Sequence, residues 1–377
     1  MLILSAGPTT IAKNTLEAMS IQRWNADLSR DFYAQYQRLV AKYDQLIKNS
    51  TGYSFIMGAE AMIALEGACA SLIESGDKVL VLSNGIFGRG FADLVIMYGG
   101  EPIMVYDEDN RGFSLEAVKK AVAENPDAKM ATMIHCETPT GVTNDVVPIC
   151  QFLRKCGILS VVDSVSAIGG EALNYEESGI DVLLGGSQKC LSAPSGLGMV
   201  TLSREAIKVL ENRESPIASF YANYKYFLNW QEKMWFPYTM PEQLINALEA
   251  ALDNILEEDF LKKHADFAEI TRRVLQENGL KLFAQSHHSN TLTAFYVPEQ
   301  TNAFRILEHL QKEHSIQISG SLAEYQSTLL RIGHMGENNR PEFFEQLFTA
   351  MDKTWYELGL GESDFSGSFQ KAVKAVR

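Results

Sequence analysis

A carboxylate and an amine in the stretch Ile158–Gly198 could act together on one ligand. Asp163 directly follows the apolar run Ile158–Val162, and Lys189 follows the apolar run Ile180–Leu184 after a short turn. Each run is too short for a typical helix and is typical of a buried parallel strand. Because ligands bind beside the carboxyl ends of such strands, we expect both side chains at one binding edge.

The pairing of Asp163 with Lys189 indicates the chemistry of pyridoxal 5′-phosphate (PLP). An amine can form an imine with the aldehyde of PLP, and a carboxylate can keep the pyridine nitrogen protonated so that the ring accepts electrons. A lone aspartate after a strand is more often a turn residue, and a lone lysine more often lies on a solvated surface, so only the combination favours a ligand site. The segment Gly185–Cys190 is not a P-loop, because the chain has no GxxxxGK[ST] pattern.

The residues around this pair resemble the lysine region of the class V aminotransferases of PLP fold type I. VVDSVSAIGG and GIDVLLGGSQKCLSAPSGLG are similar to the family patterns D-S-V, G-x-D and G-S-Q-K-x-L-x-x-P-x-G. Within the class, the chain is most similar to the group that uses alanine or serine with glyoxylate or pyruvate. The resemblance covers nearly the whole chain and implies an α/β fold, with a large domain built on a mostly parallel, doubly wound sheet and a smaller C-terminal α/β domain.

The resemblance also implies which residues bind the cofactor and the substrate. Lys189 would hold PLP as an internal aldimine, Asp163 would hold the ring nitrogen, and Arg331 would bind the substrate carboxylate. Gly7 lies in an N-terminal arm that would cross the active site beside the substrate. The other positions implied in cofactor binding are Ala59, Glu60, Ala61, Met62, Phe87, Thr138, Val165, Ser187, Gln188 and Thr239.

Two of these positions also have ordinary structural explanations. Phe87 follows the predicted strand Lys78–Leu82 and matches the family's N-G-x-[WF]-G, whose aromatic lies against the pyridine, although a phenylalanine alone would more often pack in the core. Thr138 follows the predicted strand Met130–His135 in HCETPTG and matches the residue that binds the phenolic oxygen of PLP. A threonine in a turn is otherwise a common capping residue.

The turn Gly58–Met62 departs from the family pattern. It connects the apolar run Ser54–Met57 to a predicted helix, and the N-terminus of such a helix suits a phosphate. The family's G-S-G-[TH] provides a hydroxyl or an imidazole there, whereas this chain has Glu60 and Met62. Because a carboxylate repels a phosphate dianion, we expect Glu60 to point away or to pair with a cation, so that only backbone contacts carry over.

Arg331 lies within the apolar strand predicted at Leu329–His334, in a segment that resembles the family's L-R-I-G-x-[ML]-G. A buried arginine needs an anionic or polar partner, and bidentate binding of a carboxylate is a standard use for one. A structural ion pair with an aspartate or glutamate is the alternative.

The segment Leu210–Thr239 is rich in aromatic residues, which is typical of a subunit interface or of a satellite core beneath a long loop. Its end resembles the family's x-x-x-T-x-P, whose threonine reaches the PLP phosphate of the neighbouring subunit. Thr239 in that role would imply a C₂ homodimer with a shared active site.

Length and charge limit the domain organisation and the partners. The 377 residues divide by pattern into an N-terminal arm (1–20), a large PLP-binding domain (21–258) and a small C-terminal domain (259–377). A net charge of −14 argues against nucleic acid or an anionic membrane as the main partner. The chain has no signal peptide, no run of about 18 apolar residues and no peroxisomal ending, so we expect a cytoplasmic protein.

The cysteines and histidines show no metal-binding spacing. Five cysteines form no CxxC pair and seven histidines form no HExxH, so we expect reduced thiols and no metal site. No cysteine follows Cys190, which disfavours a cysteine desulfurase, because that chemistry needs a mobile cysteine in the small domain.

The resemblance therefore implies ping-pong transamination between a small amino acid and a 2-oxo acid, glyoxylate or pyruvate. Three alternatives stay open: a 2-aminoethylphosphonate–pyruvate transaminase, a PLP-dependent lyase of the same fold, and a PLP-binding protein without catalysis. The sequence does not identify the amino donor.

Overall fold

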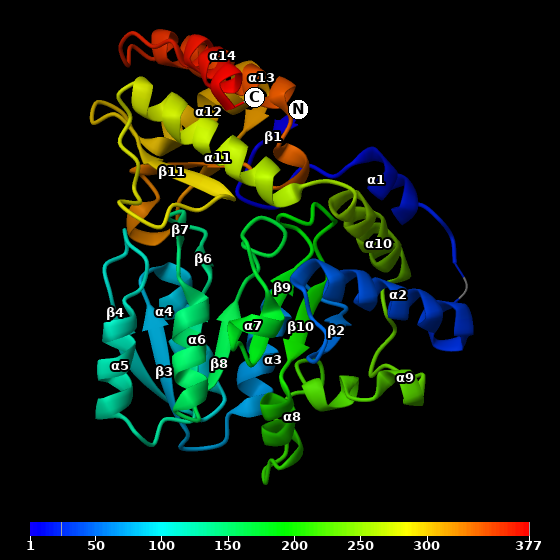
Figure 1. The fold of residues 1–377 in the computed structure, drawn as a ribbon. Helices are drawn as coiled ribbons and strands as arrows, with labels where there is room; N and C mark the ends of the chain where they lie inside the picture. The colour runs from blue at the N-terminus through cyan, green and yellow to red at the C-terminus, as the bar shows by residue number, and fades with distance from the viewer. Residues whose placement is uncertain (24, 377) are drawn as a thin grey trace.

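A seven-stranded sheet forms the centre of the larger domain. The computed structural model describes residues 1–23 and 25–376 (Figure 1). The strands are β2 (Tyr53–Met57), β3 (Lys78–Ser83), β4 (Glu101–Tyr106), β5 (Met130–Ile134), β8 (Leu159–Asp163), β9 (Val182–Gly186) and β10 (Gly198–Leu202). They lie in the order β2-β10-β9-β8-β5-β3-β4, with β10 antiparallel to both neighbours and the strands from β9 to β4 parallel. The mostly parallel sheet expected from the sequence is confirmed.

Helices flank this sheet and supply the crossovers between its parallel strands (Figure 1). The helices of the larger domain are α2 (Arg30–Ile47), α3 (Met62–Leu72), α4 (Ile86–Met97), α5 (Leu115–Glu124), α6 (Val146–Lys155), α7 (Tyr175–Ser178), α8 (Arg204–Glu211), α9 (Trp230–Lys233) and α10 (Glu242–Leu256). α1 (Lys13–Met19) packs on α10. α5 begins where the Ser114 hydroxyl accepts the Ala117 N–H, which is a standard N-cap contact.

A smaller antiparallel sheet organises the C-terminal part of the chain. β11 (Leu292–Tyr296), β13 (Ser319–Gly320) and β14 (Leu329–Gly333) lie in the order β11-β14-β13. Around them pack α11 (Phe260–Glu277), α12 (Ala303–His314), α13 (Pro341–Glu357) and α14 (Phe365–Val376). β12 (Ile316–Gln317) pairs in parallel with β1 (Leu2–Ile3), so both ends of the chain lie at this domain (Figure 1).

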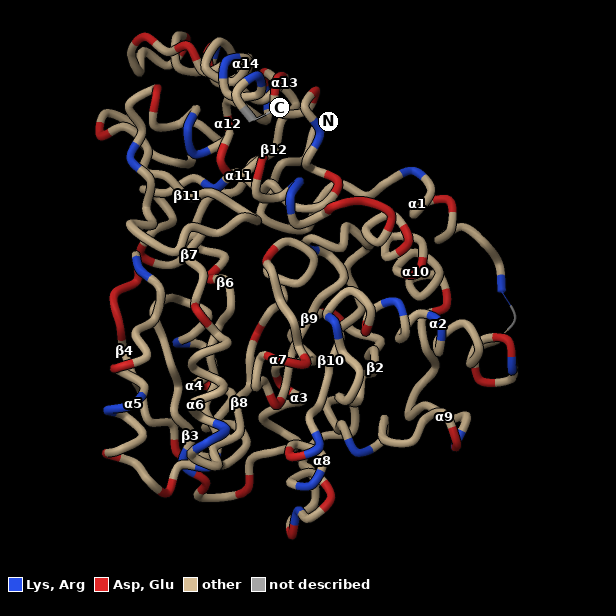
Figure 2. Tube along the Cα trace, viewed as in Figure 1, with Lys and Arg blue, Asp and Glu red and all other residues tan. Residues whose placement is uncertain are grey.

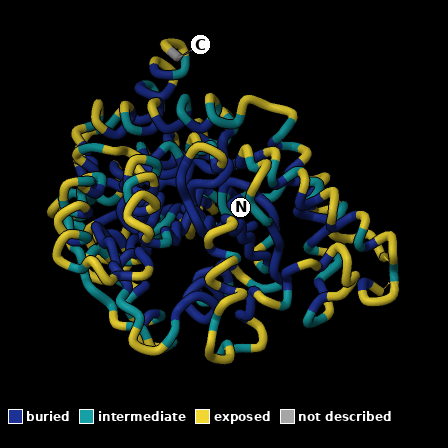
Figure 3. The backbone as a smooth tube through the Cα atoms, turned by 60° about the horizontal axis from the view of Figure 1, so that its bottom comes forward, coloured by how far each residue is buried: buried dark blue, intermediate teal, exposed yellow. Residues whose placement is uncertain are grey.

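Two hydrophobic cores correspond to the two sheets. The larger core draws its buried residues from Ala26 to Ile255, and the second draws them from Phe267 to Ala372 together with Leu2 and Leu4. In Figure 3 the buried stretches lie inside the molecule and the exposed stretches lie on its outer helices and loops. The first residues of the chain therefore pack with the small domain, and the next ones run from it toward the large domain.

Charged residues occupy the outside of the fold. In the view of Figure 2, acidic and basic residues are interspersed along the outer helices and loops and do not form one basic face. Among the residues that the structure describes, every helix is too short or too polar to cross a membrane.

The sequence did not predict β10 or the last two helices. β10 follows the polar loop after Lys189 and returns antiparallel between β9 and β2. Its run of apolar residues could equally have belonged to a loop or a helix, because periodicity does not classify short apolar runs. Only the pairing with β9 and β2 determines the strand.

The contact between α2 and the edge strand β2 gives a test of stability. The Tyr36 hydroxyl donates to the Ile56 carbonyl at 2.7 Å and accepts the Ile56 N–H at 2.6 Å, in a fully buried position. Tyr36→Phe removes the hydroxyl, so the N–H and the carbonyl of Ile56, on an edge strand, both lose their partner. The free energy of unfolding should therefore fall by about 1–3 kcal/mol. Urea denaturation measures this change.

Tyr33→Phe is the matched control, since Tyr33 lies one turn earlier on α2 and its hydroxyl makes no hydrogen bond with any residue in the described part of the chain. We expect the control to change stability by less than about 0.5 kcal/mol. Equal losses in the two variants would contradict the role of the Tyr36 hydroxyl.

Candidate functional site

A cavity of about 300 Å³ lies at the carboxyl ends of the central strands. It is lined by Gly7, Pro8, Glu60, Ala61, Met62, Leu65, Phe87, Thr138, Asp163, Val165, Ser166, Gln188, Lys189 and Ser195. The fold therefore brings together both predicted catalytic residues and most of the predicted cofactor-binding positions. Pro8, Leu65, Ser166 and Ser195 were not predicted from the sequence.

Lys189 lies in the turn after β9, beneath the N-terminal arm. Its Nζ donates to the Ala6 carbonyl at 2.7 Å, and Thr9 Oγ1 donates to the Lys189 carbonyl at 3.0 Å. Burial lowers the pKa of the Lys189 amine, the positive charge of Arg331 lowers it further, and Asp163 partly opposes both effects. A lowered pKa leaves more of the amine neutral near pH 7, which is the form that attacks an aldehyde.

Asp163 is the last residue of β8 and faces the same cavity. Its Oδ1 accepts the Val165 N–H at 2.9 Å. Burial raises the pKa of Asp163 to about 6. The hydrogen bond from the Val165 N–H and the charge of Lys189 lower this pKa, and the charge of Glu60 raises it. A cationic ring nitrogen beside this carboxylate would relieve that cost of burial.

Phe87 is the second residue of α4 and does not belong to either hydrophobic core. Its side chain is 37% exposed and lines the cavity, which supports the stacking role over core packing. Glu137 supports this turn, because its carboxylate accepts the N–H groups of Phe87 at 3.2 Å and Gly88 at 2.6 Å. Burial raises the pKa of Glu137 to about 7. The motif HCETPTG contains Glu137, but the sequence pattern alone assigns this residue no role.

Thr138 and Arg331 connect the two domains at the site. The Thr138 hydroxyl lies 2.5 Å from that of Ser166, and Arg331 Nη1 donates to the Thr138 carbonyl at 2.8 Å. Arg331 Nε donates to the Gly320 carbonyl at 2.7 Å, and the side chain is only 8% exposed although it does not line the cavity itself. Burial lowers the pKa of Arg331 to about 10.

In the described part of the chain, no carboxylate forms an ion pair with Arg331, whose other contacts are to backbone carbonyls. The structural ion pair considered as an alternative is therefore absent from those contacts. A buried guanidinium without a counter-charge suits an incoming carboxylate.

Three predicted cofactor-binding residues do not line this cavity. Ala59 lies in the turn before α3, outside the lining residues. The Ser187 hydroxyl donates to the Pro194 carbonyl at 2.7 Å and holds the loop that follows Lys189. Thr239 is exposed and its hydroxyl donates to Asp27 Oδ2 at 2.7 Å. Direct contacts of these three residues with a cofactor stay predictions.

The expectation for Glu60 was wrong. Glu60 lines the cavity although it is exposed to solvent, and no cation among the described residues pairs with it: one carboxylate oxygen accepts the Met62 N–H at 2.8 Å, and the other accepts the Gln188 side-chain amide. Two neutral donors, the first N–H of α3 and the Gln188 amide from the turn after β9, stabilise the carboxylate in place of a cation.

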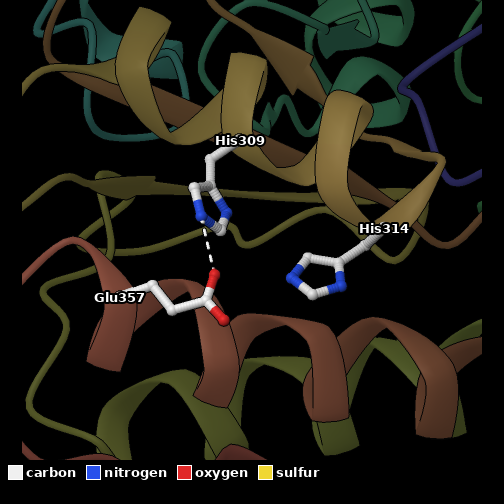
Figure 4. A group of neighbouring side chains, drawn as sticks. All are labelled: His309, His314 and Glu357. Carbon is white, nitrogen blue, oxygen red and sulfur yellow. Dashed lines mark ion pairs between the residues drawn. The ribbon is translucent and has the colours of Figure 1, made fainter.

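A second group of possible ligand side chains lies in the small domain, away from this cavity. The ligand atoms of His309, His314 and Glu357 lie within 4.8 Å of one another on α12 and α13 (Figure 4). His309 Nε2 is 2.9 Å from Glu357 Oε2, and its Nδ1 is 3.2 Å from the Thr354 hydroxyl. Both nitrogens of His309 thus have protein partners, and its contact with Glu357 joins the two helices.

Comparisons with known proteins agree with the geometry. The family model described as aminotransferase class-V matches residues 1–324. An uncharacterized aminotransferase of Methanocaldococcus jannaschii is 32% identical, over 89% of this chain and 88% of its own. A serine–glyoxylate aminotransferase of Methylorubrum extorquens is 29% identical, over 88% and 86%.

A third similar protein is named for a different amino donor. The pyridoxamine–pyruvate transaminase of Mesorhizobium japonicum is 28% identical, over 93% of this chain and 90% of its own. The crystal structure of a pyridoxamine–pyruvate aminotransferase from Mesorhizobium loti superposes with a TM-score of 0.93 at 27% identity, and it covers 100% of this chain and 96% of that one.

The arm above Lys189 gives a test of the site. Gly7 has φ of +92°, and a Cβ there would lie 2.3 Å from Lys189 Cδ, so Gly7→Ala must displace the lysine or the arm. We expect pyridoxal to react with Lys189 at least roughly 10-fold more slowly, as followed by absorbance. Gly76→Ala is the control, because Gly76 has φ of +84° with no atom within 4 Å of the added Cβ. It shares the backbone strain only, and a rate as slow as that of Gly7→Ala would contradict the steric explanation.

Proposed function

The chain belongs to the class-V aminotransferases, and we propose that its cavity transfers an amino group from a small donor to glyoxylate or pyruvate, with a pyridoxal ring as the carrier. The observation that carries this proposal is the convergence of Lys189 and Asp163 on one buried cavity. The named relatives use glyoxylate or pyruvate as acceptor, whereas their donors differ, being serine in one and pyridoxamine in the other.

PLP was the cofactor expected from the sequence, and the cavity suits one end of it. Lys189 can meet the aldehyde, Asp163 can meet the ring nitrogen, and the exposed ring of Phe87 offers a stacking surface. The turn before α3 presents the Glu60 carboxylate to the same cavity, and a carboxylate does not suit a phosphate dianion. The proposal therefore concerns the pyridoxal ring, with or without its 5′-phosphate.

When bound, the ring supplies an aldehyde for amino exchange and a pyridine that takes up electrons. Lys189 is placed to hold the aldehyde and, once released, to move a proton at the carbon that carries the amino group. Asp163 holds a proton on the ring nitrogen, and Arg331 binds the carboxylate that amino acids and 2-oxo acids share. Burial of all three excludes water, which strengthens each of these contacts.

We also infer a C₂ homodimer that joins an exposed aromatic face of two chains. Phe220, Tyr221, Met234 and Trp235 are about half exposed, whereas Tyr224, Phe227, Trp230 and Phe236 of the same segment are buried in the large core. The buried aromatic residues thus agree with the core interpretation of this segment, and the exposed ones are available for the proposed interface. Thr239 lies outside its own cavity, which supports a role at the neighbouring site.

Free cysteines, four of them buried, suit the reducing cytoplasm that we propose as the location of this protein.

A donor screen tests the proposed function. Purified protein supplied with PLP or pyridoxal is assayed with alanine, serine and pyridoxamine against glyoxylate, pyruvate and 2-oxoglutarate. We expect transfer to glyoxylate or pyruvate, and a loss of roughly 1,000-fold in Lys189→Ala, because no other lining residue offers an amine. Lys208→Ala, at an exposed position on α8, should retain the activity. No transfer from any donor to any acceptor would contradict the proposal and favour the lyase.

The raised pKa of Asp163 predicts a pH dependence of ring binding. The carboxyl group is ionised above about pH 6 and becomes protonated as the pH falls through that value. Its attraction for a protonated ring nitrogen should thus be present above pH 6 and lost below it, so the affinity for pyridoxal should weaken on acidification. Titration of pyridoxal binding by absorbance between pH 5 and 8 measures this change.

Two variants assign the titrating group. Asp163→Asn should bind pyridoxal more weakly at pH 8 and should lose the step near pH 6. Glu137→Gln removes a second buried carboxyl group that titrates in this range, while its amide oxygen can still accept one of the two N–H groups of Phe87 and Gly88. If the step disappeared in Glu137→Gln and persisted in Asp163→Asn, the assignment would be wrong.

A further inference from the structure

The turn between β2 and α3 ends the cavity with a carboxylate. The two oxygens of Glu60 accept the Met62 N–H and the Gln188 side-chain amide, so the donors closest to this end already have an acceptor. The lining residues carry two acidic groups, Glu60 and Asp163, against one basic group, Lys189. The ionisable groups that line the cavity therefore carry an excess of acidic side chains, and Glu60 is the one at this turn.

A phosphate ester would meet this end unfavourably. A phosphate group is doubly negative near neutral pH and only accepts hydrogen bonds from protein donors. At the N-terminus of α3 it would compete with Glu60 for the same N–H groups and would repel the carboxylate at short range. A neutral hydroxymethyl group in the same place could instead donate a hydrogen bond to Glu60.

Gln188 provides independent evidence that this part of the cavity suits a ligand with a hydrogen-bond donor. Its side chain is 5% exposed, and its Oε1 is buried without a hydrogen-bond partner among the described residues. The contact between Gln188 Nε2 and Glu60 fixes the orientation of the amide, because the flipped amide would place its oxygen against a carboxylate oxygen. A hydroxyl can satisfy a buried acceptor, whereas a phosphate dianion cannot.

We propose that this site accepts the unphosphorylated ring, pyridoxamine or pyridoxal, as a substrate that enters and leaves in each turnover. The inference rests on the proposed amino transfer and names its donor. The 2-oxo acid is the co-substrate, and its carboxylate lies against Arg331. The ring is recognised at its nitrogen by Asp163 and at its hydroxymethyl group by Glu60 and Gln188.

The reaction balances without an added oxidant or reductant. The bond between nitrogen and the 4′ carbon of pyridoxamine breaks, and a bond between nitrogen and the 2-carbon of the oxo acid forms. The 4′ carbon is oxidised to the aldehyde while the oxo carbon is reduced to the amino acid, and water is taken up and returned in equal amounts. Protons move between the two carbons through the amine of Lys189.

Glu60→Gln tests the discrimination. The full chain is given pyruvate with either pyridoxamine or pyridoxamine 5′-phosphate, and alanine formation is measured by chromatography. Binding of pyridoxal and of PLP is measured in parallel by equilibrium dialysis, which needs no turnover. In the unaltered chain we expect kcat/KM for pyridoxamine, and affinity for pyridoxal, to exceed those of the phosphate esters roughly 100-fold.

The variants separate charge from shape. Glu60→Gln keeps the length of the side chain and an oxygen for the Met62 N–H, so it should bring the preference within roughly 5-fold, mainly by tighter binding of the esters. Glu60→Asp keeps the charge and should keep a preference of at least roughly 10-fold. Binding of pyridoxal by Glu60→Gln shows that its cavity is intact.

Two results would overturn the inference and leave amino transfer in place: phosphate esters that bind the unaltered chain as well as the free vitamers, or an unchanged preference in a Glu60→Gln chain that still binds pyridoxal. Alanine or serine reacting through resident PLP, with no turnover of pyridoxamine, would also overturn it. If no donor of either kind reacted, the proposed function would fail as well.

Discussion

The removal of one amine and one carboxylate from water is the constraint on which the site depends. Lys189 and Asp163 are both buried, and burial disfavours the charged form of each, which lowers the pKa of one and raises the pKa of the other. Among the described residues, neither group forms an ion pair: the Lys189 amine donates to the Ala6 carbonyl, and Asp163 accepts the Val165 N–H. The free-energy cost of this burial is offset by the large core beneath the two groups, whose parallel strands end at this edge. Both groups are therefore available to interact with a cationic ring and an aldehyde.

The same edge is closed by elements of the small domain. Leu2 and Leu4 pack in the small core, and the next residues of the arm lie over Lys189, where the Ala6 carbonyl accepts its amine. Arg331, from β14, reaches the Thr138 carbonyl of the large domain. A shift of the small domain against the large one would therefore move the arm and the guanidinium together relative to Lys189, so that carboxylate binding and access to the amine are coupled.

Glu60 shows how one residue can change which ligand a helix N-terminus suits. A helix N-terminus beside a cavity attracts anions, and here the chain supplies its own anion from the preceding turn. The carboxylate puts negative charge where a helix N-terminus alone would favour an anion, and it also raises the pKa of Asp163. Family membership indicates the type of reaction, whereas the charge at this turn influences which ligand takes part in it.

The sequence by itself determined the alternation of strands and helices, the position of Asp163 and Lys189 after buried strands, and the likeness to the class-V aminotransferases, because these signals are local runs and spacings. It also exposed the departure at Glu60, but it misjudged where that side chain points. Only the tertiary structure decided that Glu60 contacts Gln188, that Glu137 holds the turn of Phe87, and that β10 returns between β9 and β2. Each of these contacts joins residues far apart in the chain, and the pattern around either residue carries no information about the other until the chain has folded.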